Sequence, residues 1–226
     1  MNDTLNYYLY EEIVPRYADF DMAHRQDHAL TVMEQAMRLL DSRDAWLEAR
    51  PDADPSWRVP VDRGMLLTAA ACHDLGLVNG RENHHMDSGS IIRSDARLRE
   101  WFDPSQIEMI AQAAEDHRAS GKSAPRSIYG MIVAEADRVI DGDTIIRRTL
   151  QFGFRNYPGL DRMAHICRAI GHLNEKYGRG GYMKLWIPWS DNAARLSILQ
   201  DTIASDDDIL ATVSRIYDEL ESAELA

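Results

Sequence analysis

A histidine and an aspartate stand side by side where this sequence predicts a helix core. His73 and Asp74 end an apolar run, and apolar residues lie three, four and seven positions before His73. This spacing places His73 on the inward face of a helix, with Asp74 about 100° round the helix from it. Burying two unpaired polar groups costs about a few kcal/mol, so the pair needs a partner. A metal ion is one solution, and a backbone carbonyl that accepts from a core histidine is the other.

Further polar side chains fall on inward faces of other expected helices. His28 opens an apolar stripe that runs to residue 40, and His117 closes a helix with apolar residues three and seven positions before it. Asp137 lies on the apolar face of a later helix, and His85 lies in a loop or first turn. A set of four histidines and two carboxylates without a thiolate suits a divalent transition metal. We expect one or two ions, with iron or manganese favoured over zinc, and two ions would share one bridging carboxylate.

The elements that must position these side chains all have helical patterns. The expected helix starts are Asp27, Asp62, Asp103 and Ser127. Gly76 or Gly80 would close the helix of the His73–Asp74 doublet, and the next helix is expected over about 86–97. Four more helices are expected over about 144–152, 161–177, 191–203 and 206–220. No alternating strand pattern or hairpin signal occurs, so the predicted fold is all-α, in one helical domain.

Composition and charge exclude several classes of function. The 226 residues include 25 basic and 37 acidic side chains, for a net charge of −12, which argues against binding to a nucleic-acid backbone. The two cysteines lack a paired spacing and indicate a reduced, cytoplasmic protein. No apolar run approaches the ~20 residues of a membrane span. We therefore expect a small-molecule partner, no nucleic-acid polymer and no membrane, and a homo-oligomer is compatible with the sequence.

The order of His28, His73–Asp74 and Asp137 resembles the signature of the HD-domain superfamily of metal-dependent phosphohydrolases. The sequences around the three positions also resemble it: DHAL at 27–30, ACHDLG at 71–76 and AEADRVI at 134–140. The resemblance covers an HD core of about 21–142 and leaves about 143–226 as a helical C-terminal extension. It implies that these four residues hold a first metal ion, with His73 and Asp74 at the catalytic centre.

Some branches of the superfamily hold a second ion with two additional histidines, and His85 and His117 are similar to those positions. Asp74 would then bridge the two ions. We assign His85 as the ligand and its neighbour His84 to the substrate, although the two could exchange these roles. Many relatives carry a lysine where this chain has Leu77. Positive charge for the substrate must then come from other residues, and the candidates are Arg81, Arg118, Lys122 and Arg126.

The resemblance implies hydrolysis of a phosphate ester or anhydride by metal-activated water, with a nucleotide as the expected substrate. Two other functions remain open. One is a di-iron oxygenase, because some members of the superfamily cleave carbon–carbon or carbon–phosphorus bonds with oxygen. The other is a nucleotide-binding regulatory module without catalysis. Oxygen uptake by a ferrous sample would distinguish the oxygenase from the hydrolase.

The segment 178–189 has no counterpart in the resemblance. Glycines at 178, 180 and 181 precede two tryptophans and Lys184. Trp186 and Trp189 either seal the C-terminal helices onto the core, which is the common role of such residues, or cover the metal site. In the second case Lys184 would meet a substrate phosphate and an aromatic ring would stack on a base.

Overall fold

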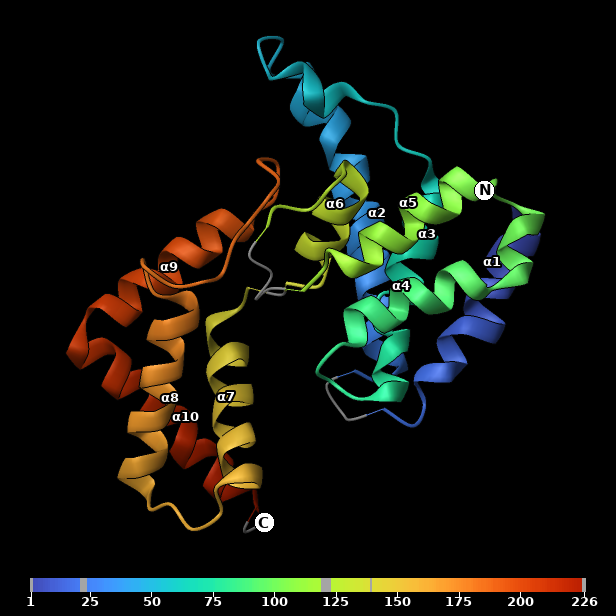
Figure 1. Ribbon diagram of the computed structural model, residues 1–226. Coiled ribbons are helices and arrows are strands. Elements are labelled where there is room, and N and C mark those ends of the chain that lie inside the picture. The colour runs from blue at the N-terminus through green and yellow to red at the C-terminus, as the bar shows by residue number, and fades with distance from the viewer. Residues whose placement is uncertain (1, 21–23, 119–122, 139, 225–226) are drawn as a thin grey trace. The chain divides into compact units, whose positions relative to one another are not determined.

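The described part of the chain is entirely helical. The computed structural model describes residues 2–20, 24–118, 123–138 and 140–224, and these residues form ten α-helices and no strand (Figure 1). The predicted all-α class is confirmed. Within these ranges no helix combines the length and the apolar character that crossing a membrane requires. The chain divides into two compact units: residues up to 138 together with 186–190, and residues 139–185 together with 191 onward.

In its described residues, the first unit contains six α-helices and the candidate ligands. The helices are α1 (Asp3–Tyr8), α2 (Gln26–Glu48), α3 (Arg63–Cys72), α4 (His84–Ser94), α5 (Pro104–Glu115) and α6 (Ile128–Ala136). Helix α3 packs against α2, α5 and α6, and α4 packs against α5. Every residue of α3 from Met65 to Cys72 is buried, which explains why its sequence is apolar on all sides. The doublet that follows α3 therefore lies in the interior of the unit.

Three of the four expected helix starts are confirmed. Asp62, Asp103 and Ser127 each accept a backbone N–H of the first turn of α3, α5 or α6. The prediction for Asp27 is wrong, because α2 begins at Gln26 and Arg25 is its N-cap residue. Asp27 instead lies in the first turn, where a carboxylate interacts favourably with the positive end of the helix dipole.

The chain turns sharply between the doublet and α4. Helix α3 ends at Cys72, and a 3₁₀ helix, η4 (Leu75–Asn79), leads to Gly80, whose φ of 102° lies in the left-handed region. Gly76 packs so closely on the start of α4 that an added Cβ would lie 2.0 Å from the His84 carbonyl oxygen. Helix α4 starts at His84, two residues earlier than predicted, and ends at Ser94. Both His84 and His85 are therefore in its first turn.

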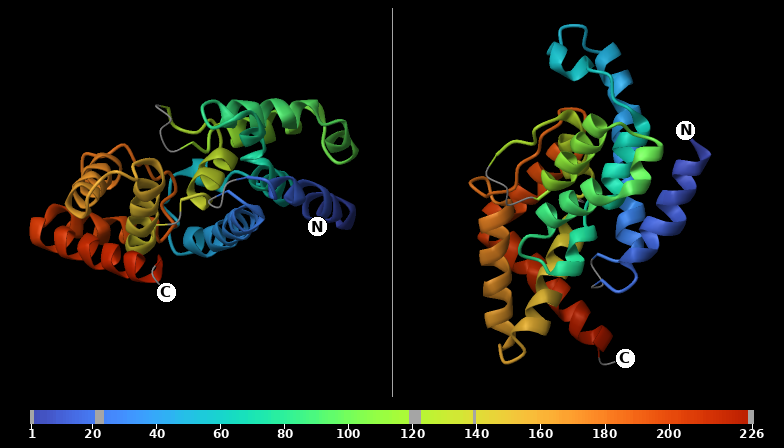
Figure 2. Two further views of the ribbon diagram at one scale, coloured as in Figure 1. Left: turned by 90° about the horizontal axis from the view of Figure 1, so that it is seen from below. Right: turned by 45° about the vertical axis from the view of Figure 1, so that its right-hand side comes forward.

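The segment 186–190 belongs to the first unit rather than to the C-terminal helices that surround it in sequence. The Trp189 Nε1–H donates to the Leu39 carbonyl oxygen at 2.8 Å. Its ring centroid lies 5.7 Å from that of Trp46 and 5.3 Å from that of Trp57. The right-hand view of Figure 2 shows that the last turns of α2 and the loop that follows it extend at one end of this unit. Trp189 is therefore a packing residue.

The described part of the second unit is a bundle of four helices. They are α7 (Gly142–Asn156), α8 (Arg162–Tyr177), α9 (Asn192–Ala204) and α10 (Asp206–Glu224), close to the four expected ranges. Their core includes Leu150, Leu173, Val213 and Ile216, all fully buried. The helices α7, α8 and α10 pack against one another, and α9 packs against α8 and α10.

Candidate metal centre

The His73–Asp74 doublet is fixed by hydrogen bonds at the end of α3. His73 is fully buried and Asp74 is 3% exposed. The buried Tyr17 hydroxyl donates to the Ala71 carbonyl oxygen at 2.7 Å and accepts from the Asp74 N–H at 3.2 Å. Tyr17 thus ties the N-terminal segment to the residues on which the centre is built. An aromatic residue in an apolar segment was the sole sequence signal for this role.

A first group of possible metal ligands consists of His28, His73 and Asp137. The Nε2 atoms of His28 and His73 are 3.3 Å apart. The Asp137 Oδ1 lies 3.2 Å from the His28 Nε2 and 3.9 Å from the His73 Nε2. The two histidines come from the start of α2 and the end of α3, and Asp137 follows α6 directly. Three helix termini therefore converge on one point.

A second group consists of Asp74, His84 and His117. The Nε2 atoms of His84 and His117 are 3.3 Å apart. They lie 3.4 Å and 3.3 Å from the Asp74 Oδ1. Two nitrogen ligands of one tetrahedral zinc ion, each about 2.0–2.1 Å from it, would be about 3.3 Å apart. The spacing of the imidazoles in both groups matches ligands that share an ion.

Asp74 lies between the two groups. Its Oδ2 is 3.4 Å from the His73 Nε2 and 3.7 Å from the His28 Nε2, whereas its Oδ1 faces His84 and His117. The Oδ1 atom is buried and makes no hydrogen bond of acceptable geometry with the described residues. A buried carboxylate oxygen without a hydrogen bond is costly unless a cation meets it. This arrangement is typical of a carboxylate that bridges two metal ions.

Backbone carbonyl groups orient three of the imidazoles. The Nδ1 atoms of His73, His84 and His117 lie 2.7, 2.8 and 2.5 Å from the carbonyl oxygens of Ala70, Arg81 and Ala114. Because a carbonyl oxygen only accepts, each Nδ1 must carry a proton and donate. When such a ring is neutral, its Nε2 atom directs a lone pair into the cluster. Metal-bound histidines are held in this way by partners outside the coordination sphere.

The electrostatics keep the carboxylates ionised. Burial alone would raise the pKa of Asp74, but the imidazoles of His73 and His117 outweigh it and hold that pKa far below its usual range. Burial is likewise outweighed at Asp137, where a hydrogen bond from His28 and the charge of His73 lower the pKa. At His73 burial disfavours the charged ring, but Asp74 and Asp137 raise the pKa to about 9. A metal ion at the His73 Nε2 would therefore displace a proton.

The structure brings His84, rather than the predicted ligand His85, to the cluster, and which of the two binds a metal stays a prediction. His84 belongs to the second group, and His85 belongs to neither group. Successive residues of a helix point about 100° apart, so only one of the two can face the cluster. The His85 Nδ1 is buried without a hydrogen-bond partner among the described residues. Burial, followed by the charge of Arg118, lowers the pKa of His85.

The residues expected to bind substrate lie in different surroundings. Arg81 lies 3.0 Å from a ring nitrogen of His24, and Arg118 donates to the Glu82 carbonyl oxygen at 2.8 Å. Arg126 is already neutralised by carboxylates, in ion pairs of 2.6 Å with Glu115 and 2.9 Å with Asp116. These pairs occupy its guanidinium, and its role in substrate binding stays a prediction. Lys122 lies outside the described residues, and Lys184 belongs to the second unit.

Glu115 is a buried carboxylate that the sequence analysis did not identify. It is 6% exposed and pairs with Arg93 of α4 as well as with Arg126. The pair with Arg93 connects α4, which begins at His84, with α5, after which His117 follows, and the pair with Arg126 connects α5 with the chain that leads to α6. The only sequence signal was a glutamate on the apolar side of α5, one turn after Ala111.

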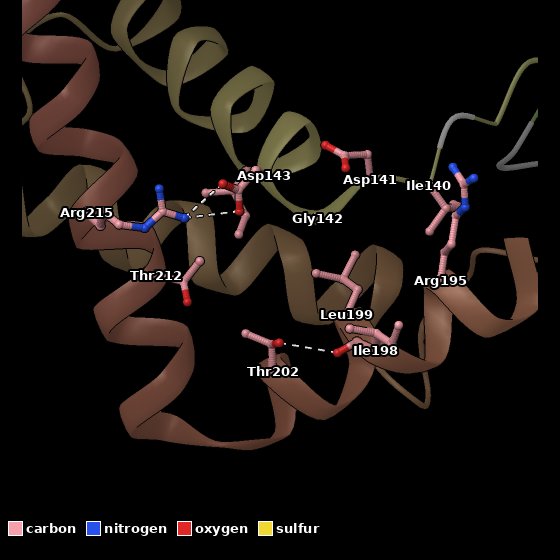
Figure 3. A pocket seen from close by; sticks show the side chains of 11 residues that line it. Ile140, Asp141, Gly142, Asp143, Arg195, Ile198, Leu199, Thr202, Thr212 and Arg215 are labelled. Carbon is pink, nitrogen blue, oxygen red and sulfur yellow. Dashed lines mark hydrogen bonds and ion pairs between the residues drawn. The ribbon is translucent and has the colours of Figure 1, made fainter.

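The second unit has a hollow of its own, of about 470 Å³, between α7, α9 and α10 (Figure 3). Arg215 on its wall pairs with Asp143 at 2.9 Å and with Glu219 at 2.6 Å. Ile146 and Leu199 contribute apolar surface. In the described ranges, both groups of possible metal ligands belong to the first unit, and none of their residues lines this hollow.

Comparison with known proteins agrees with the geometry. The family model of the HD domain matches residues 25–141, which is more than half of the 226 residues. All six residues of the two groups lie within that range. Comparisons with curated proteins and with solved structures gave no match. HD domains are typical of metal-dependent hydrolases and imply binding of a divalent metal. The two His/Asp groups and the family match together show that the chain belongs to the HD domain family.

Proposed function

We propose that this protein hydrolyses a phosphate ester or anhydride of a small molecule, with a nucleotide as the expected class of substrate. The observation that carries the proposal is the position of Asp74, whose two oxygens face two separate groups of imidazoles. A centre of this kind suits displacement at phosphorus, in which the attacking and leaving oxygens both need stabilisation.

The residues present fit two divalent metal ions. His28, His73 and Asp137 would hold one, His84 and His117 would hold the other, and Asp74 would contribute an oxygen to each. Each group supplies nitrogen and oxygen atoms alone, which favours iron, manganese or zinc. When bound, such ions lower the pKa of a bound water to about 7 and neutralise phosphoryl oxygens.

The protein's own groups prepare the site for this reaction. The carbonyl groups of Ala70, Arg81 and Ala114 hold three imidazoles in one tautomer, and Tyr17 fixes the backbone of Asp74. Preorganised ligands do not have to reorient during the reaction. Arg118 and Arg81 would donate to the anionic substrate. Arg118 directly follows the ligand position His117 in the sequence, and Arg81 precedes His84 by three residues.

Metal analysis and a substrate screen test the proposal. Protein purified without oxygen should contain a transition metal and release phosphate from one or more nucleotides after addition of manganese, iron or zinc. Asp74→Ala should remove metal and activity together, and the exposed Asp52→Ala should change neither. Oxygen uptake without phosphate release would indicate the di-iron oxygenase. Nucleotide binding without turnover in the metal-loaded protein would indicate a regulatory module.

A further inference from the structure

A hollow of about 440 Å³ lies beside the second group of possible ligands. His85 and Arg118 both line it, and they directly follow His84 and His117 in the sequence. The ring centroids of His84 and His85 are 5.6 Å apart. At both positions, the residue that lines the hollow is therefore the next in the sequence after a residue of the second group.

The acidic residues of this hollow are already paired. The Oε2 of Glu115 accepts from the Arg126 guanidinium at 2.6 Å, and its Oε1 accepts from Arg93. Asp116 accepts from the backbone N–H of Arg126 at 2.7 Å and from its Nε–H at 3.0 Å. The lining of the hollow therefore contains two carboxylates, Glu115 and Asp116, and two guanidinium groups, Arg118 and Arg126, so that its formal charges cancel.

The donors of the hollow are not fully used. Among the described residues, Arg118 donates only to the Glu82 carbonyl oxygen, although a guanidinium carries five N–H groups. The His85 Nδ1 is buried and has no partner in the same ranges. Buried polar atoms are nearly always hydrogen-bonded, so the His85 ring has hydrogen-bonding capacity that the described residues do not use, and His85 lines the hollow beside Arg118. An arginine and an imidazole with spare N–H groups match a phosphate or diphosphate oxygen.

We propose that His85 and Arg118 bind a second phosphate of the substrate, next to the phosphate held at the His/Asp cluster. The inference rests on the proposed function and narrows it to phosphoric anhydrides, such as a nucleoside diphosphate or pyrophosphate. In the reaction, the oxygen of water bonds to the phosphorus at the cluster and the bridging P–O bond breaks. The bridging oxygen leaves with the second phosphate, which His85 and Arg118 hold, and one proton is released to solvent near neutral pH.

Paired substrates with and without the second phosphate test this assignment. Arg118→Ala and His85→Gln should raise the KM for pyrophosphate and ADP about 10- to 100-fold more than the KM for p-nitrophenyl phosphate, because hydrogen bonds to a charged group are lost. The exposed Arg99→Ala is the matched control and should leave all KM values unchanged. If the substitutions raise the KM for ADP but not for pyrophosphate, the hollow recognises a nucleoside diphosphate. If they raise both KM values, the hollow recognises the diphosphate group alone.

Two measurements that do not need turnover accompany the kinetics. Metal content should stay at the unsubstituted level in His85→Gln, and its loss would show that His85 is a ligand and overturn the inference. Calorimetry with imidodiphosphate, which is not hydrolysed, should show about 10-fold weaker binding to metal-loaded Arg118→Ala. Equal kinetic effects on both substrate types, or unchanged imidodiphosphate binding, would also overturn the inference. If no substrate releases phosphate, the proposed function fails, and the calorimetry still decides whether the hollow binds a diphosphate.

Discussion

Gly76→Ala should separate the two groups of possible metal ligands. An alanine Cβ at this position would lie 2.0 Å from the His84 carbonyl oxygen, 2.5 Å from the Ser88 backbone nitrogen and 2.7 Å from the Asp87 Cβ. Two of these atoms belong to the backbone, so a change of rotamer cannot relieve the contact. Helix α4 must move away from η4, and it carries His84 with it.

The size of the movement follows from the contact distance. Ordinary van der Waals contact of a Cβ begins at 3.4 Å, so the 2.0 Å approach requires a shift of about 1.4 Å. Metal–ligand distances tolerate only about 0.2 Å. Overpacking of this kind costs about 1–3 kcal/mol. At about 2–4 °C per kcal/mol for 150–250 residues, the Tm should fall by about 2–12 °C.

Metal stoichiometry and thermal unfolding are the two assays. We expect Gly76→Ala to lose the metal of the Asp74–His84–His117 group and to retain that of the His28–His73–Asp137 group. The control is Gly171→Ala in α8, where nothing lies within 4 Å of an added Cβ. That variant should keep its metal and gain about 0.5–1 kcal/mol, because alanine is the better helix former.

The reasoning would be refuted by a Gly76→Ala protein with unchanged metal content and unchanged Tm. That result would mean that α4 does not depend on the close approach at Gly76. Loss of all metal at an unchanged Tm would also contradict it, because the shift would then have disturbed Asp74 rather than His84.

Three other substitutions test separate parts of the structure. Asp74→Asn keeps the shape of the side chain but removes its charge. Metal affinity should therefore fall by more than the roughly 10–100-fold that is typical when a hydrogen-bond partner outside the coordination sphere is removed. Full metal content in anaerobically purified protein would exclude a bridging role. Trp189→Ala should lower the free energy of unfolding by about 3–5 kcal/mol in denaturant titrations without loss of metal, because Trp189 is 8% exposed and packs on two other tryptophans. Hydrogen bonds from Arg93 and Gln112 lower the pKa of Glu108 from 4.5 to about 2, so its ionised form stabilises the fold above pH 4.5 and this contribution is lost as the pH falls toward 2. Glu108→Gln should therefore flatten the pH dependence of unfolding in that window, by about 1 kcal/mol or less because this side chain is only half-buried, and an unchanged slope would contradict the pairing.

Helical periodicity was sufficient to identify most of the candidate centre. A polar residue three or four positions from apolar neighbours must lie on the buried face of its helix, whatever the helix packs against. This argument singled out His73, His117 and Asp137. The order of His28, the His73–Asp74 doublet and Asp137 along the chain then led to the HD domain family. Helix starts at Asp62 and Asp103 were equally local, because a capping side chain bonds to a backbone only two or three residues away.

Other features depend on how separate segments meet. Whether His84 or His85 faces the cluster depends on where α4 begins and on its close contact with Gly76, eight residues earlier. Trp189 packs against Trp46 and Trp57, more than 130 residues away in the sequence. No local pattern carries this information, because sequence spacing fixes directions only within one element.

The charges show the same division. The sequence alone determined that Arg118 and Arg126 are cationic and close to His117, but it treated them as equivalent. Only the tertiary structure decided that Glu115 and Asp116 neutralise Arg126 while Arg118 keeps spare donors beside His85. An ion pair forms between side-chain ends, whose separation depends on the packing of α4 and α5 and on the chain that leads to α6. The sequence thus supplied the chemical groups, and their pairing followed from distances that only the packed helices set.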